Sequence, residues 1–478
     1  MQNPLGKNQA IWHKVSNLQQ ILGPLLTLTA FTIPTVAHAG GLEYPDNGTI
    51  SIGRGGADAA NPDDGLAFQY NPAGLAQQRG LRLTLDARLA SQYVKFQSAL
   101  AGTAAVTNGA PPFLSPSGSL SYGFGKVGFL SDLTIALGAT GPSAIGKVRY
   151  PGEGAQRYAL NSTDYFIGYY SLAVAAAWRD LIRIGLTGQL VHGTATFSQA
   201  VWSGQGQGPK DANDTQSDAT ATFSGTSGMI PTFVAGITVT PTPAWAIGIS
   251  YRPQIDFNAP GTLDIALPGF AVKQGFSVEG NSADLHINLA ATLRAGIQYK
   301  LTERALLELD GVWERWSSFK EIRVATHDIL VHGLPGFPAA NVPDVVFPHN
   351  FTDTYSIRLG SDVTVVDDRL IVRAGYLFET SAVPTAYVSM DFPNWQRHAL
   401  SAGASLKLWG AWLDVAYAHH FVQSQAITDS QVVQQVAPET QPIPKAVPSV
   451  IGNGKYDSGL DLFSLSLRIP FSDLHAKF

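Results

Sequence analysis

From Leu81 onward, hydrophobic and polar side chains alternate along the chain with a period of two. This period puts alternate side chains on opposite faces of an extended chain, so each such segment is predicted to be a β-strand with one apolar face. In residues 245–257 one face carries Trp245, Ile247, Ile249, Tyr251, Ile255 and Phe257, and the other carries Gly248, Ser250, Arg252, Gln254 and Asp256. A soluble β-sandwich gives the same local pattern, so alternation alone does not identify the solvent on the apolar side.

The lengths of the connections between these segments indicate a membrane barrel. The predicted strands begin near Leu81, Ser117, Leu133, Thr163, Ile182, Thr226, Ala244, Ala283, Ala305, Asp353, Leu370, Gln396, Ala411 and Gly459. Long loops alternate with short connections around Ser131-Asp132, Arg179-Asp180, Pro241 to Pro243, Lys300 to Arg304, Val366 to Asp368 and Trp409-Gly410. Bacterial outer-membrane barrels join their strands in this way. The sequence therefore predicts an all-β fold, an antiparallel transmembrane β-barrel of about fourteen strands over residues 81–471.

Composition and charge agree with this class and exclude others. Only 14% of residues are charged, and no apolar run long enough for a membrane-spanning helix occurs outside the N-terminus. The net charge is -5 without a basic cluster, which argues against nucleic acid as a partner. Four tryptophans lie beside the short turns, where an interfacial aromatic girdle is expected: Trp178, Trp245, Trp409 and Trp412.

The first 39 residues resemble a cleavable secretion signal. Lys7, His13 and Lys14 form a charged start, Ile21 to Val36 is apolar, and Ala37-His38-Ala39 fits a cleavage site. The alternative is a transmembrane anchor, which Pro24 and Pro34 would interrupt. Cleavage predicts export to the outer membrane of a Gram-negative bacterium, where outer-membrane lipid surrounds the barrel.

The chain ends with a strand that would pair with the first one and close the barrel. Phe463, Leu465, Leu467, Ile469 and Phe471 give it five outward apolar residues. Residues 472–478 are then either a short tail or the continuation of a longer strand that ends at Phe478.

Residues 40–80 precede the first strand and are too polar and irregular to face lipid. A barrel of about fourteen strands encloses more space than its own side chains fill, so this segment is predicted to fold back into the lumen as a hatch.

Several motifs of the chain resemble those of the FadL/TodX family of outer-membrane transporters for long-chain fatty acids and hydrocarbons. In the hatch they are Gly53 to Ala57 (GRGGA), Pro62-Asp63-Asp64 and Asn71-Pro72-Ala73-Gly74-Leu75; in the barrel they are Trp245 to Phe257 (WAIGISYRPQIDF), Trp313 to Phe319 (WERWSSF), Asp353 to Gly360 (DTYSIRLG) and Arg397 to Gly403 (RHALSAG). Their order along the chain is that of the family. The resemblance implies a barrel closed by an N-terminal hatch, ligand capture among the extracellular loops, and exit of the ligand through a gap in the wall.

The third strand offers a physical counterpart to such a gap. Gly138, Gly141, Pro142 and Gly146 interrupt it, and proline removes a donor from the ladder while glycine permits a bend. Our hypothesis is that these residues mark a lateral gate. The alternative is that the strand ends at Gly141 and that Pro142 begins the next loop.

A fatty acid needs an apolar pocket and a cation for its carboxylate. The resemblance around WSSFKEIRVAT makes Arg323 the first candidate for this cation, and Arg149 and Arg157 are weaker candidates. The alternative for Arg323 is a solvated arginine paired with Glu321. In the hatch, Asp63 and Asp64 are predicted to engage arginines of the lumen.

The sequence gives little support to an enzyme. His398, His419 and His420 lack the spacing of metal ligands, and no serine lies in a G-x-S-x-G motif. We therefore predict no catalytic residue, no metal and no cofactor. The predicted function is passive uptake of long-chain fatty acids or related hydrophobic compounds. The alternatives are an uptake channel for aromatic hydrocarbons and a surface protein, such as an adhesin or phage receptor, built on the same barrel.

Overall fold

The computed structural model of the chain describes residues 47–141, 147–203, 214–333, 338–392, 395–435 and 448–471. The chain divides into two units, Met1–Ala37 and His38–Phe478. The first unit, and with it the predicted signal sequence of residues 1–39, lies outside the described residues. Within the described ranges, no helix is long and apolar enough to cross a membrane.

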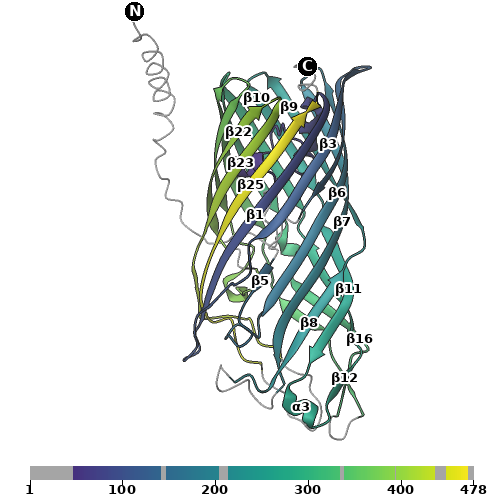
Figure 1. Cartoon of the computed structure of the whole chain (residues 1–478), viewed down its shortest axis with the longest axis vertical. Helices are drawn as coiled ribbons and strands as arrows, with labels where there is room; N and C mark the ends of the chain where they lie inside the picture. Colours follow the sequence, from purple (N-terminus) through teal and green to yellow (C-terminus); the bar gives the residue numbers. More distant parts are fainter. Residues whose placement is uncertain are drawn as a thin grey trace, which may run out of the picture. The chain divides into compact units, whose positions relative to one another are not determined.

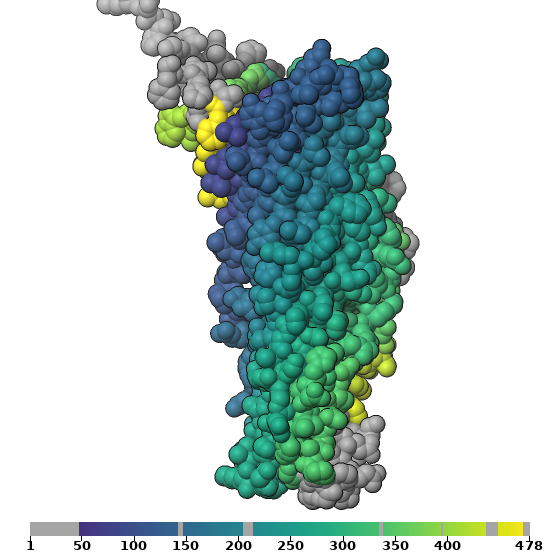
Figure 2. Space-filling model, turned by 90° about the vertical axis from the view of Figure 1, so that its right-hand side faces the viewer, coloured from purple at the N-terminus to yellow at the C-terminus, as the bar shows by residue number. Residues whose placement is uncertain are grey.

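Fourteen antiparallel strands close into a barrel, as the sequence predicts (Figure 1). Each strand pairs with the next along the chain, and β25 pairs with β1 from Arg82↔Pro470 to Ser98↔Gly454, which closes the ring. The strands of the ring are β1 (Gly80–Ser98), β3 (Phe113–Val127), β4 (Leu130–Thr140), β6 (Ser162–Trp178), β7 (Ile182–Trp202), β9 (Ile230–Thr242), β10 (Trp245–Arg252), β14 (Thr292–Thr302), β15 (Ala305–Glu314), β20 (Thr354–Val366), β21 (Leu370–Glu379), β22 (Arg397–Leu408), β23 (Ala411–Val422) and β25 (Gly454–Pro470). Figure 2 shows that strands next to each other on the outer face follow one another in the sequence, because the colour changes in order from blue through teal to green.

Further strands extend the wall on the side of the long loops. We call six of them the loop-side tier: β5 (Lys147–Arg149), β8 (Asp218–Thr226), β11 (Ile255–Ala266), β13 (Ser282–Leu289), β16 (Glu321–His327) and β19 (Val345–Pro348). The ladders β7·β8, β8·β11, β11·β13, β13·β16 and β16·β19 make this tier continuous with the ring. The remaining strands are β2 (Val106–Thr107), β24 (Gln425–Ile427) and a separate small sheet of β12 (Ser277–Glu279), β17 (Leu330–His332) and β18 (Ala340–Asn341). The helices are short: α2 (Thr49–Gly53), α3 (Gly269–Lys273), η2 (Ala67–Gln69), η3 (Pro72–Gln77), η4 (Trp316–Ser318) and η5 (Thr385–Tyr387).

The wall reverses its polarity between the ring and the loop-side tier. In β10, Trp245 and Ile247 face outward and are 41% and 43% exposed, whereas Ser250 is buried in the lumen. In β11, Ile255 and Phe257 are instead buried, each 2% exposed. The prediction that these two residues share the face of Trp245 is therefore wrong. Pro253 and Gln254 belong to neither strand, and the chain changes faces at this break.

The other loop-side strands show the same reversal. Ala283, Leu285 and Ile287 of β13 are buried and His286 is exposed, and Ile322 and Val324 of β16 are buried on either side of exposed Arg323. Apolar residues inside and polar residues outside are the pattern of a sheet that faces water. In the ring, by contrast, outward positions such as Leu85, Leu172 and Leu465 are apolar and exposed. This gives the band that lipid requires, and we place its outer edge at the junction of the two tiers.

The short turns lie together at the end of the barrel opposite the loop-side tier, at the top of Figure 1. Five of the six predicted turns agree with the structure within about two residues, the usual uncertainty of element ends. The first turn is wrong: it lies at Gly128 and Phe129 rather than at Ser131-Asp132, because bulges near Gly125 lengthen β3. Trp178, Trp245 and Trp409 are exposed at this end, as a girdle requires. The last strand ends at Pro470, and residues 472–478 lie outside the described residues.

Residues 47–79, between the first described residue and β1, form a hatch inside the lumen. Helix α2 contacts β22, β23 and β25, while η3 contacts β6, β7 and β9 on the other side of the ring. The hatch therefore crosses the lumen from wall to wall.

Candidate functional site

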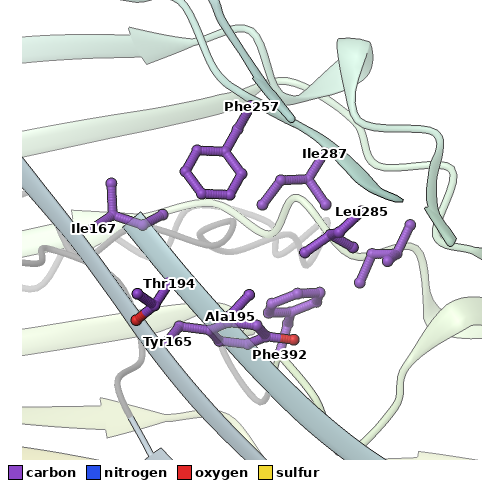
Figure 3. A pocket seen from close by; sticks show the side chains of 9 residues that line it. Tyr165, Ile167, Thr194, Ala195, Phe257, Leu285, Ile287 and Phe392 are labelled. Atoms are coloured by element: carbon purple, nitrogen blue, oxygen red, sulfur yellow. The ribbon is translucent and has the colours of Figure 1, made fainter. Parts of the chain in front are cut away.

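A small apolar pocket lies inside the loop-side tier. Its lining residues are Tyr165, Ile167, Thr194, Ala195, Phe257, Leu285, Ile287, Ile322 and Phe392. Figure 3 shows their side chains converging on one space, with the rings of Phe257 and Phe392 on different sides of it. None of these nine residues is charged. The polarity reversal contributes to this pocket, because Phe257, Leu285 and Ile322 point inward from the loop-side tier.

The pocket has a free volume of about 10 Å³. One water molecule needs about 10–15 Å³ by the same measure, and sites for drug-sized ligands span about 300–1,000 Å³. A hydrophobic ligand therefore fits only if one of the walls moves.

The pocket adjoins a part of β6 that lies between two described ladders. The ladder between β4 and β6 ends at Thr140↔Tyr169, and the ladder between β5 and β6 begins at Lys147↔Asp164. Residues 142–146 lie outside the described residues, and we call the part of the wall between the two described ladders the interruption. The intervening residues of β6 include Tyr165 and Ile167, which both line the pocket. On the outer face of β6, apolar Phe166 is followed towards the loops by polar Asp164, so the interruption lies at the edge of the apolar band.

Of the four predicted gate residues, Gly141 lies at the end of β4 and Gly138 lies within the β4 ladders. Gly141 follows the end of β4, and its N–H donates to the carbonyl oxygen of Pro116 over 2.7 Å. Pro142 and Gly146 lie outside the described residues. Gly138 is an inward position of β4, where an added Cβ would lie 2.3 Å from the ring of Phe68 in the hatch. The structure thus brings Gly138 against the hatch, and the lateral gate stays a prediction.

Arg323 does not face the pocket. It lies on the outer face of β16, between Ile322 and Val324, which point inward. Its guanidinium pairs with Glu321 at 2.7 Å and with Asp344 at 3.2 Å, and these partners raise the pKa of Arg323. The side chain therefore corresponds to the solvated arginine that the sequence analysis kept as an alternative, and a role in binding a carboxylate stays a prediction.

The two other candidate arginines have different neighbours. Arg149 is exposed on β5, beside residues 108–109. Arg157 is 1% exposed and donates to Asp218 over 2.6 Å, to the hydroxyl of Tyr158 over 3.1 Å and to the carbonyl oxygen of Asp214 over 3.0 Å. These bonds join the connection between β5 and β6 to the segment that begins β8, and a ligand role for Arg157 stays a prediction.

Arg54 forms the centre of the ion pairs between the hatch and the wall that the described residues show. It is 2% exposed and pairs with Glu308 of β15, with Asp362 of β20 at 3.6 Å and with Asp58 of the hatch at 3.3 Å. Burial raises the pKa of Asp58 to about 8, although the Arg54 guanidinium lowers it. Arg54 lies in the GRGGA motif but was not among the predicted site residues, and its isolation among glycines was the signal available in the sequence.

Backbone groups of the hatch complete its attachment to the wall. The N–H groups of Ala59 and Ala60 donate to Asp310 over 2.7 Å and to Glu308 over 2.8 Å. Thr49 donates through its N–H and its hydroxyl to Asp86 of β1, over 2.8 and 2.7 Å. The seam between β1 and β25 thus holds the start of the hatch.

The predicted hatch residues are buried, except for Asp63. Asn71 begins η3, accepts from the Ala73 N–H over 3.2 Å, and donates to the Thr238 hydroxyl of β9 over 3.1 Å. Gly74 follows Pro72 and Ala73 in η3, and an added Cβ would lie 2.0 Å from the Pro62 carbonyl oxygen. Asp64 accepts from the Leu66 N–H over 2.8 Å. The predicted ion pairs of Asp63 and Asp64 with lumen arginines stay untested.

Glycines of the wall leave space for the hatch, because they have no side chain that would collide with it. At nine inward positions an added Cβ would lie within 3.2 Å of a hatch atom: Gly123, Gly138, Gly185, Gly236, Gly248, Gly296, Gly360, Gly375 and Gly403. Six of them form three cross-strand pairs, Gly185↔Gly236, Gly248↔Gly296 and Gly360↔Gly375. The quoted strand motifs contain several of these glycines, yet the sequence analysis did not select them.

Within the described ranges, no group of three or more His, Cys, Asp or Glu side chains has the arrangement of a metal site. The chemistry of the two sites is therefore that of apolar contact in the pocket and of ion pairs and hydrogen bonds in the hatch.

Comparisons with known proteins agree with this architecture. The chain is similar to a Pseudomonas aeruginosa FadL homologue, with a TM-score of 0.72 and 18% identity over 91% of this chain and 100% of that one. The P. putida toluene transporter TodX has a TM-score of 0.64 and 15% identity over 90% of this chain and 99% of that one. The CymD monoaromatic hydrocarbon channel has a TM-score of 0.62 and 17% identity over 90% and 99%. At these identities the likeness shows the fold.

A comparison with curated proteins gave no match. The model of the family described as outer membrane protein transport protein (OMPP1/FadL/TodX), however, matches residues 30–450, most of the chain. The chain therefore belongs to the OMPP1/FadL/TodX family, a family of outer-membrane transporters of hydrophobic compounds.

Proposed function

We propose that the chain mediates passive uptake of long-chain fatty acids or related hydrophobic compounds and releases them sideways through the barrel wall. One observation carries this proposal: Tyr165 and Ile167 line the uncharged pocket and also belong to the part of β6 that lies between the two described ladders. A ligand in this pocket is thus one strand away from the outer surface. It moves down its own gradient and needs no cofactor.

The contents of the lumen support a sideways path over an axial one. On the turn side, the hatch crosses the lumen and buries ionisable groups against the wall, including Arg54 of the hatch and Glu308 of β15. An axial path would need the hatch to break these bonds, at a cost of several kcal/mol for each buried charge left unpaired. At the interruption, by contrast, the ligand passes apolar side chains and reaches the outer edge of the lipid band. In this proposal, movement of the hatch controls access to the pocket, and the ligand does not leave through the space that the hatch fills.

The uncharged lining favours aromatic hydrocarbons as a second candidate class of ligand. An ionised fatty acid would bring a carboxylate, and none of the nine lining residues is a cation that could neutralise it. The TodX and CymD structures are described as those of a toluene transporter and of a monoaromatic hydrocarbon channel. Neutral aromatic rings need only apolar surface, whereas a fatty acid would place its carboxylate outside the pocket.

Uptake by cells tests this function. A Gram-negative host that lacks its own transporter would produce the protein, and its uptake of labelled toluene and labelled oleate would be compared with that of cells carrying the empty plasmid. We expect faster uptake of at least one compound. Uptake of oleate alone would favour fatty acids as the ligand, and uptake of toluene alone would favour aromatic hydrocarbons. If the cells took up neither compound faster than the control, the result would favour a surface protein without transport activity. Arg323→Ala is included because loss of oleate uptake would give Arg323 the ligand role that the sequence suggested.

The sideways path makes a separate prediction at Gly168, on the interrupted part of β6. An added Cβ there would lie 3.2 Å from the flexible ring of Phe166, so a large side chain fits with a small shift. We expect Gly168→Trp to obstruct the outer mouth and to slow uptake about tenfold, the effect of a barrier higher by about 1.4 kcal/mol. The matched control is Gly188→Trp on the outer face of β7, where a Cβ has only a contact at 4.0 Å. Equal uptake by the two variants would argue against the sideways path.

A further inference from the structure

One wall of the pocket differs from all the others in how it is held. Eight lining residues belong to strands β6, β7, β11, β13 and β16, where ladders fix the backbone. Phe392 alone comes from an irregular segment, between η5 and β22. Because the pocket must widen to take a ligand, Phe392 is the wall that can move without breaking a ladder. We call Val388–Phe392 the strap.

The strap alternates between buried and partly buried residues. Val388, Met390 and Phe392 are 1%, 1% and 3% exposed and pack into the apolar interior of the loop side. The carbonyl oxygen of Met390 accepts from the hydroxyl of Tyr150 over 3.3 Å. Tyr150 directly follows β5, on the loop side of the wall interruption. The strap thus touches the pocket with one residue and the border of the interruption with another.

A buried ion pair holds the strap in this position. The Nε2 atom of His349 lies 2.8 Å from a carboxylate oxygen of Asp391, and its Nδ1 atom lies 2.8 Å from the carbonyl oxygen of Phe347. Both partners are acceptors, so a ring that satisfies both carries two N–H groups and a positive charge. Burial raises the pKa of Asp391, but His349 and the Ser389 hydroxyl lower it by more, so it lies below its usual range.

Aromatic rings surround this pair and include the wall residue itself. The His349 ring lies 5.4 Å from Phe319, 5.3 Å from Phe351 and 5.3 Å from Phe392, between ring centroids. His349 is 3% exposed, so water hardly screens its attraction to Asp391. Loss of the Asp391 carboxylate would leave Nε2 of His349 buried among these rings without its charged partner, and movement of the strap would then restore its contact with water.

We infer that His349 and Asp391 form a latch which holds Phe392 in the space that the ligand takes, and that the latch sets the largest hydrophobic ligand the protein admits. This inference rests on the proposed function. His349 and Asp391 are positioning residues, because they act on the ligand only through Phe392. The strap that the latch holds also lies between the pocket and Tyr150 at the interruption. Movement of the strap therefore widens the pocket on the side towards the proposed exit.

The test compares ligands of two sizes, toluene and naphthalene, in the cell uptake assay. Asp391→Asn removes the charge and keeps the shape, and Phe392→Ala removes the wall and no charge. In both variants we expect the ratio of naphthalene uptake to toluene uptake to rise about tenfold. One or two apolar contacts in a pocket discriminate between ligands of different size by about this factor. A purely structural role would lower both uptake rates together and leave the ratio unchanged.

The barrel offers a matched control on its outer face. His327 and Asp284 form a similar pair over 2.9 Å, but they are 50% and 30% exposed and lie away from the pocket. Asp284→Asn should leave the ratio at the wild-type value. An unchanged ratio in Phe392→Ala overturns the inference even if Asp391→Asn fails to assemble. Wild-type cells that take up neither compound would instead overturn the proposed function, which separates the two failures.

Discussion

Replacing Gly375 with valine should displace the hatch and turn the closed barrel into an open pore. An added Cβ at Gly375 would lie 2.1 Å from the backbone nitrogen of Gly55 and 2.2 Å from the carbonyl carbon of Arg54. These are backbone atoms of the hatch, which cannot rotate away as a side chain can. Gly375 itself lies in β21 without a positive φ, so valine suits its strand conformation. The one wall atom among the nearest three, Ser401 Oγ at 2.6 Å, ends a side chain that can rotate, so the collision falls mainly on the hatch.

The measurement is ion conductance of the purified protein in planar bilayers. Overpacking of a well-packed interior costs about 1–3 kcal/mol even where side chains can adjust, so the closed state should lose at least about fivefold in population. The matched control is Gly311→Val, because Gly311 lies on the outer face of β15 with open space around its Cβ position. If Gly375→Val conducted no more than Gly311→Val, the hatch would not depend on its contact with this glycine.

The barrel was predictable because its signals are local and repeated. The turn at Arg179 and Asp180 links two long alternating segments, and both residues have positive φ, as a tight hairpin turn requires. The turn at Trp409 and Gly410 has the same form. The first turn was missed, since Gly125 adds a bulge that shifts the end of β3 away from the polar residues Ser131 and Asp132.

The pocket was not predictable, because the alternation within a strand does not show which of its two faces points inward. Ile255 and Phe257 continue the odd-numbered apolar pattern of β10, yet they face the opposite way after the break at Pro253. Arg323 illustrates the same difficulty. Its residue type suits a carboxylate, but its neighbour Ile322 faces the pocket, so Arg323 has to face away. A proline between two alternating segments was the signal that the sequence offered.

The attachment of the hatch depends on partners far apart in the sequence. Arg54 and Glu308 are separated by 254 residues, and only closure of the barrel brings them together. The glycines Gly248 and Gly296 were visible as breaks in strand composition, and a glycine inside a strand indicates close approach of another backbone. That inference would have located the hatch contacts without the structure. It would not have identified which part of the hatch lies against them.

Replacing Arg54 with methionine should loosen the hatch even though methionine fills a similar volume. Glu308, Asp58 and Asp362 would lose the cation that they share, and Glu308 is fully buried. Breaking a buried pair by removing one partner costs about 3–5 kcal/mol. The matched control is Arg304→Met, because Arg304 and Asp367 form a pair that is 59% and 65% exposed, and such pairs contribute about 0–1 kcal/mol.

Limited proteolysis of the hatch and bilayer conductance would both report the effect of Arg54→Met, and we expect faster cleavage and higher conductance than in Arg304→Met. Adding Glu308→Gln to Arg54→Met should recover part of the loss. The amide oxygen of glutamine can still accept from the Ala60 N–H, which Glu308 now accepts over 2.8 Å, and it leaves one carboxylate fewer without a partner. No recovery in the double variant would mean that the charge of Arg54 holds the hatch through Asp58 and Asp362 instead, which would move the centre of the attachment from β15 to β20.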